Sequence, residues 1–118
     1  MNETKDTVKL MVTKEMSKSQ KQKIFLPMIA VLIQYAYAIG YELTEGDAYR
    51  DPRVTYGQPF SQHRSRLAMD LNLYKDGVWL QKTEDHTPLG EFWEAMGGAW
   101  GGRFNDGNHY SIEHGGFK

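Results

Sequence analysis

The hydrophobic pattern of the chain predicts one long helix near its start. Residues 17–39 carry apolar side chains at helical spacing, and Ser17 with Gln20 can form a capping box at the beginning. Gly40 follows the last apolar residue, where a left-handed cap commonly ends a helix. Pro27 lies inside this stretch and predicts either a kink or a later start of the helix.

A strand pattern follows in the middle of the chain. In residues 67–74, Leu and Met alternate with Ala, Asp, Asn and Tyr, which is the period of two that a strand requires. Lys75-Asp76-Gly77 is typical of a hairpin turn. Further expected elements are strands at 41–44, 78–81 and 109–112 and a second helix at 88–96. The pattern predicts an α+β fold: a small antiparallel sheet with one long N-terminal helix and a shorter second helix.

Length and charge restrict the possible organisation and partners. The 118 residues suffice for a single domain, 1–118, in which we expect 1–16 to be a loosely ordered N-terminal segment. With 14 Lys+Arg against 15 Asp+Glu, the net charge is -1, so no global field favours nucleic acid or anionic lipid. The lysine-rich stretch 14–23 is more simply a solvated helix face, and we expect no nucleic-acid partner.

No targeting or membrane segment is predicted. Residues 1–23 are polar and lack the apolar core of a signal peptide. The apolar run 24–39 is shorter than the roughly 20 residues that span a bilayer. We therefore expect a soluble protein without membrane insertion, made in the cytoplasm.

The absence of cysteine limits the chemistry of any metal site. With no Cys, disulfides, thiolate ligands and a cysteine nucleophile are excluded, so a metal must be held by His and carboxylate. All four His and all three Trp follow residue 45. The candidate site therefore lies in the later part of the chain.

Two stretches carry residues of the type that bind metal. His63 precedes the predicted strand, and Asp70 lies within it on the face away from the leucines; an Asp in mid-strand opposes strand propensity. Asp106 and His109 are three residues apart around Gly107. Two His and one Asp with a spare carboxylate match the needs of zinc catalysis. The alternative is a solvent-facing Asp70 and an exposed His109 in a Gly-Asn loop.

The remaining His and Trp residues leave further alternatives open. His114 is a rival third ligand, but it adjoins Glu113, and neighbours on a strand point to opposite faces. We prefer His109 and keep His114 as a supporting or substrate-contacting residue, the alternative being a surface position. His86 is expected in a turn or at a helix start. The three Trp residues are expected in the core.

These motifs resemble the M15 family of zinc peptidases. The family pattern Ser-x-His, x6-Asp and carboxylate-x-x-His corresponds to Ser61-Gln62-His63, Asp70 and Asp106-Gly107-Asn108-His109, and Tyr49-Arg50 fits an aromatic–Arg pair ahead of the metal loop. Small phage-encoded members are the most similar, over roughly residues 20–116. The chain departs from them in Leu67, where many have Gly, and in a short segment between Arg50 and His63.

The resemblance implies a role for each of these residues. His63, Asp70 and His109 would bind one Zn²⁺ per chain, and Asp106 would take a proton from water and deliver it to the leaving amine. Arg50 would stabilise the oxyanion.

Three further residues receive supporting roles. Ser61 would orient the metal loop or a substrate carbonyl, and His114 would orient Asp106 or hold substrate. A carboxylate-rich stem peptide would suit Arg103 as an anchor.

The resemblance also implies the substrate and its setting. We expect a peptidoglycan endopeptidase, an endolysin that cuts the L-Ala-D-Glu bond during phage lysis. The alternatives are a D-Ala-D-Ala carboxypeptidase and a non-catalytic virion or cell-wall-binding module. The protein would reach the periplasm and the cell wall through a membrane hole made by a holin. We expect it to act as a monomer.

Overall fold

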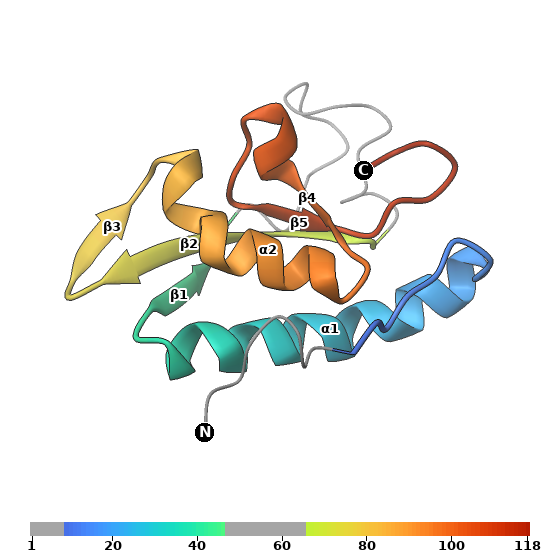
Figure 1. Ribbon diagram of the computed structural model, residues 1–118, viewed down its shortest axis with the longest axis horizontal. Coiled ribbons are helices and arrows are strands. Elements are labelled where there is room, and N and C mark those ends of the chain that lie inside the picture. Colours follow the sequence, from blue (N-terminus) through green and yellow to red (C-terminus); the bar gives the residue numbers. More distant parts are fainter. Residues whose placement is uncertain (1–8, 47–65) are drawn as a thin grey trace, which may run out of the picture.

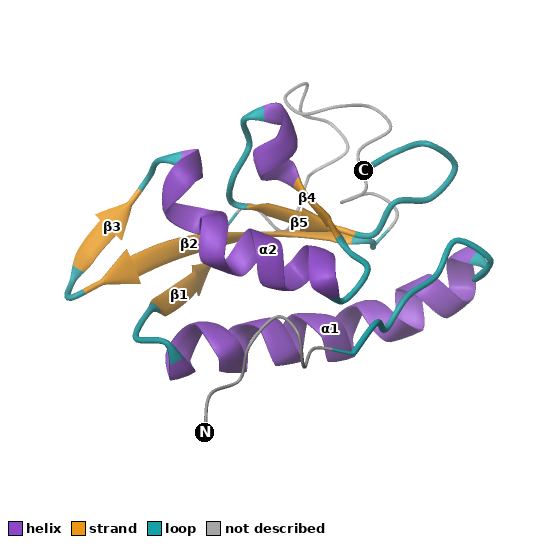
Figure 2. Ribbon diagram, in the orientation of Figure 1, coloured by secondary structure: helices purple, strands orange, loops and turns teal. Residues whose placement is uncertain are grey.

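The computed structural model describes residues 9–46 and 66–118, which form two helices packed on a small antiparallel sheet (Figure 1). This architecture confirms the predicted α+β fold. In chain order the elements are α1 (Lys18–Ala38), β1 (Glu42–Glu45), β2 (Ala68–Lys75), β3 (Val78–Leu80), the 3₁₀ helix η2 (Thr83–His86), α2 (Thr87–Ala95), β4 (Ala99–Trp100), the 3₁₀ helix η3 (Gly101–Phe104) and β5 (His109–Ser111) (Figure 2).

Helix α1 begins and ends where its capping residues predict. The Ser17 hydroxyl accepts the backbone N–H of Gln20 at 3.1 Å, and the Gln20 side chain accepts the backbone N–H of Ser17 at 2.8 Å. Gly40 takes a left-handed φ of 96° after the last turn. Pro27 lies inside the helix and does not delay its start. Of the expected alternatives, a later start at Pro27 is therefore wrong.

Strand β2 is the central strand of the sheet. It pairs with β1 on one side and with β5 on the other, β3 continues its hairpin, and β4 completes the order β1-β2-β5-β4. The hairpin turn has φ of 52° at Asp76 and 78° at Gly77. Two successive positive φ values are those of a type I′ turn, which matches the twist of the flanking strands.

The core lies between the helices and one face of the sheet. Leu71 and Leu73 of β2 and Tyr110 of β5 are buried there with the apolar side of α1 and α2. Trp93 of α2 meets the Tyr110 ring edge-on at 6.0 Å and donates its indole N–H to the Ser111 carbonyl at 2.8 Å. These contacts fix β5 under α2.

The opposite face of β2 carries the alternate residues. Ala68, Asp70, Asn72 and Tyr74 occupy it, as the period of two predicts.

Within the described ranges, neither helix is both long and apolar enough to cross a membrane.

Candidate metal centre and active site

Asp70 and His109 are direct neighbours across two antiparallel strands. They form a register pair between β2 and β5, so both side chains project from the same face of the sheet. Asp70 Oδ1 lies 3.4 Å from His109 Nδ1. The Asp70 side chain is 13% exposed and that of His109 is 7% exposed. The solvent-facing Asp70 and the exposed His109 that the sequence left open are therefore both wrong.

Two glycines pack closely around this pair. The backbone N–H of Gly46 donates to the Asp70 carbonyl at 2.7 Å, and a Cβ at position 46 would lie 2.9 Å from Asp70 Cβ. A Cβ at Gly101 would lie 2.7 Å from His109 Cβ and would overlap the Asp106 carbonyl oxygen. Both approaches are tighter than ordinary van der Waals contact, so glycine is required at both positions.

Asp106 is held in a turn that leads into β5. Its backbone N–H donates to the Gly101 carbonyl at 2.9 Å, and its own carbonyl accepts the N–H of His109 at 3.1 Å. Asp106 is exposed, whereas His109, three residues later, is buried. The turn thus places an accessible carboxylate at the end of the strand that carries the buried imidazole.

Two residues outside the turn, Trp100 and Thr83, fix its centre, Gly107. The Trp100 indole N–H donates to the Gly107 carbonyl at 2.7 Å. The Gly107 N–H donates to Thr83 Oγ1 at 3.2 Å, and a Cβ at position 107 would lie 2.6 Å from Thr83 Cα. Strand β4 and η2 therefore hold the turn from two sides.

The other expected residues of the centre lie in the part of the chain that the structure does not describe. These are Arg50, Ser61 and His63. Within residues 9–46 and 66–118, no group of three or more His, Asp or Glu side chains is arranged to hold a metal ion. The described part of the site is thus a pair, Asp70 and His109, to which His63 would be the third ligand.

The chemistry of the pair fits a zinc ion. Imidazole nitrogen and carboxylate oxygen are both ligands that zinc accepts, and the two side chains share one face at close range. Their burial limits competition from bulk water. A carboxylate beside a metal-binding imidazole is also a common way to orient the ring.

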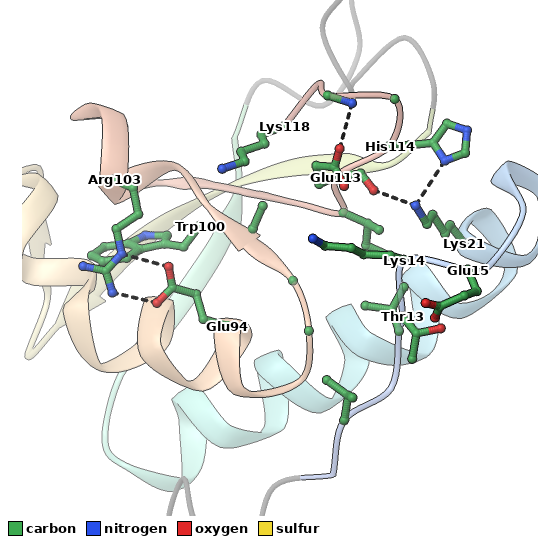
Figure 3. A pocket seen from close by; sticks show the side chains of 18 residues that line it. Thr13, Lys14, Glu15, Lys21, Glu94, Trp100, Arg103, Glu113, His114 and Lys118 are labelled. Carbon is green, nitrogen blue, oxygen red and sulfur yellow. Dashed lines mark hydrogen bonds and ion pairs between the residues drawn. The ribbon is translucent and has the colours of Figure 1, made fainter.

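His114 lies against α1. Its Nδ1 accepts a hydrogen bond from Lys21 Nζ at 3.1 Å, and the same ammonium donates to the Glu113 carbonyl at 2.9 Å (Figure 3). Lys21 is only 3% exposed. The histidine beside Asp70 is His109, while His114 joins the C-terminal segment to α1.

Arg103 is already engaged by a carboxylate. Its guanidinium makes two hydrogen bonds to Glu94, at 2.8 and 2.6 Å, and lies 5.2 Å above the Trp100 ring (Figure 3). Arg103, Glu94 and His114 all line a cavity of about 880 Å³ between the N-terminal segment, β4 and the C-terminal segment. A substrate carboxylate at Arg103 would have to replace that of Glu94.

His86 and Tyr110 form a buried pair that the sequence did not indicate. His86 Nδ1 lies 2.7 Å from the Tyr110 hydroxyl. Burial lowers the pKa of His86 to about 4, partly offset by the nearby Asp85 carboxylate, and burial raises the pKa of Tyr110. As expected, His86 lies at the start of a helix, at the N-cap position of α2, but its side chain makes no capping hydrogen bond. The partners are 24 residues apart, and no local pattern links them.

Comparison with known families bears directly on this site. A family model described as D-alanyl-D-alanine carboxypeptidase, of the M15 peptidases, matches residues 55–112. This match supports the M15 peptidase family. The matched span contains Ser61, His63, Asp70, Asp106 and His109, whereas Arg50 and His114 lie outside it. None of the curated proteins matches the chain significantly.

Proposed function

We propose that this chain is a zinc-dependent peptidase that hydrolyses peptidoglycan stem peptides at the L-Ala-D-Glu bond in phage-mediated lysis. The observation that carries the proposal is the buried Asp70–His109 pair, 3.4 Å apart, at the end of the turn that presents Asp106. The peptidase match over residues 55–112 supports the reaction class. The bond and the setting rest on the resemblance to small phage proteins.

His63, Asp70 and His109 are the residues that hold the metal in this proposal. When bound there, zinc supplies a Lewis acid for the scissile carbonyl and lowers the pKa of bound water. The close register of Asp70 and His109 supports two of the three positions. His63 is assigned from its spacing ahead of Asp70 in the sequence.

The proton transfers are assigned to Asp106. As an exposed carboxylate, it accepts a proton from the attacking water and returns it to the amine that leaves. The two backbone hydrogen bonds of the turn and the close packing at Gly107 fix the backbone of Asp106, from which its carboxylate projects. Arg50 donates hydrogen bonds to the carbonyl oxygen as negative charge develops on it. Ser61 orients the segment that carries His63.

Arg103 and His114 receive roles farther from the reacting atoms. Arg103 contacts a substrate carboxylate in this proposal only by exchanging it for Glu94, and His114, bonded to Lys21, supports the C-terminal segment. The partner is bacterial peptidoglycan, reached in the periplasm after release by a holin, and the enzyme acts as a monomer without nucleic acid.

Digestion of purified muropeptides followed by mass analysis tests the proposal. New N-terminal D-Glu is the expected product. Loss of terminal D-Ala would instead identify a D-Ala-D-Ala carboxypeptidase, the second candidate, which the description of the matched family favours. Absence of any cleavage by the zinc-loaded protein would point to a non-catalytic cell-wall or virion module.

The assignment of Asp106 has its own matched control. Asp106→Asn removes the titrating carboxylate at nearly constant shape, and we expect cleavage to fall by at least about 100-fold while bound zinc is retained. Asp76→Asn alters an exposed Asp in the β2–β3 turn and should leave cleavage unchanged. Equal activity of the two variants would contradict the role of Asp106.

A further inference from the structure

The face of β2 that carries Asp70 ends at an exposed aromatic pair. Tyr74 is four residues along the same face, and its register partner is Trp79 of β3. The two rings are stacked, with centroids 6.5 Å apart and an interplanar angle of 23°. Trp79 is 50% exposed, whereas Trp93 and Trp100 are 0% and 4% exposed. The expectation that all three Trp residues lie in the core is therefore wrong for Trp79.

The position of Tyr74 is fixed by β1. Its hydroxyl accepts a hydrogen bond from Thr44 Oγ1 at 3.4 Å, and Asn72 lies between it and Asp70 on the same face. A strand rises by about 3.3 Å per residue, so the aromatic pair lies about 13 Å along β2 from Asp70. An extended substrate centred on Asp70 can reach this distance with its neighbouring groups.

A cavity connects Trp79 with the Asp106 turn. Its volume is about 210 Å³, and it lies between the segment that follows β3 and residues 105–108. Besides Trp79 and Asp106, its wall includes uncharged amide side chains and one cation: Gln81, Asn105, Asn108 and Lys82. An aromatic face beside several amides is suited to a ligand with one apolar face and a rim of hydroxyl groups.

We propose that this cavity binds a pyranose ring of the peptidoglycan glycan strand, with the Trp79 indole stacked on the ring and the amides bonded to its hydroxyl and acetamido groups. This inference rests on the proposed function and names a subsite for it. An apolar peptide side chain would match these amides poorly, because buried polar groups without partners oppose binding. A carboxylate alone would make no use of the exposed indole.

The order of groups in peptidoglycan agrees with this placement. The L-Ala residue is joined to the lactyl group of the muramic acid, so the L-Ala-D-Glu bond is the second amide from the sugar. A residue spans at most about 3.6 Å, so L-Ala and the lactyl group, which is of similar length, place the sugar about 7 Å from that bond. The same cavity touches Asp106 and Trp79, so a substrate whose scissile bond lies near Asp106 can place its sugar at Trp79. A terminal D-Ala-D-Ala bond lies several residues farther from the sugar.

Kinetics with two substrates test the subsite. One substrate is a disaccharide-containing muropeptide, and the other is the same peptide with its sugar removed. We expect Trp79→Ala to raise KM for the first by about threefold to tenfold, the range expected for a lost aromatic contact. The KM for the second substrate and both kcat values should stay within about twofold of wild type, below the effect of one such contact. Val78→Ala, at an exposed neighbouring position on the opposite face, is the matched control. Equal effects on both substrates, or none, would overturn the subsite.

Fluorescence provides a test that does not depend on cleavage. Because Trp79 is the exposed tryptophan, iodide quenching should report mainly on it, and the free glycan disaccharide should protect it from iodide. Trp79→Phe should lose the protected signal while keeping its thermal unfolding temperature. Protection without cleavage would reject the proposed activity and leave the sugar site standing. Cleavage without protection, or without a sugar-dependent KM change, would reject the sugar site alone.

Discussion

Asp70 Oδ1 and His109 Nδ1 lie 3.4 Å apart across β2 and β5, on the sheet face opposite the helices. An Asp in mid-strand and a buried His both oppose the usual composition of a half-buried sheet. Their joint position explains each exception, since each supplies a polar neighbour for the other. Four consequences of this arrangement and of the packing that supports it are open to measurement.

The hydroxyl of Thr83 should matter for catalysis although it lies away from the reacting atoms. Thr83→Val removes the acceptor for the Gly107 N–H and loosens the Asp106 turn, so we expect kcat to fall several-fold. The lost hydrogen bond should lower the free energy of unfolding by only about 1 kcal/mol. Thr83→Ser retains the hydroxyl and should restore kcat. Equal kcat for the Val and Ser variants would show that this hydrogen bond does not position the turn.

Gly90→Ala should destabilise the protein although Ala normally favours helices over Gly by about 1 kcal/mol. A Cβ at this position in α2 would overlap the Trp100 ring, which also holds the Gly107 carbonyl. We expect the free energy of unfolding to fall by about 1–3 kcal/mol, the usual cost of overpacking. Chemical denaturation measures the change.

Gly40→Ala is the comparison for that experiment. No atom lies within 4 Å of a Cβ at Gly40, so its cost arises from the left-handed φ of 96° alone, about 1 kcal/mol. A stabilised Gly90→Ala variant would show that the α2–β4 contact is looser than the packing indicates.

His86 should make stability depend on pH. Its pKa is lowered to about 4 in the folded protein, so between pH 4 and 6.5 the unfolded state binds the proton and the folded state does not. The contribution of His86 is therefore complete above pH 6.5 and is lost as the pH falls towards 4, amounting to about 3 kcal/mol at most.

The variant His86→Asn isolates this contribution from the carboxylates that titrate in the same range. The difference in free energy of unfolding between wild type and variant should grow as the pH rises from 4 to 6.5 and remain constant above it. A difference that does not change over this range would contradict a buried, neutral His86.

Local patterns predicted much of the fold. The alternation in 67–74 places Asp70 and the leucines of β2 on opposite faces, and the Ser17 capping box and the Asp76-Gly77 turn mark where elements start and reverse. These features depend on residues close together in the chain. They were therefore accessible without knowledge of the tertiary structure.

The pairing of distant residues could not be predicted in the same way. The Asp70–His109 register depends on how β5 aligns beside β2, and the His86–Tyr110 hydrogen bond depends on how the end of η2 meets β5. Trp79 was misjudged because Trp is usually buried, whereas its hairpin extends beyond the helices that cover the core (Figure 1). Sequence alone contains no local signal for these long-range arrangements.

The central claim is that Asp70 and His109 hold one zinc ion with His63. Zinc content per chain, measured by elemental analysis after purification without chelators, tests it directly in wild type, His109→Ala, Asp70→Ala and His114→Ala. The account predicts one zinc in wild type and in His114→Ala, and loss of most of it in the other two. Absence of zinc from wild type, or full retention by His109→Ala, would contradict the account.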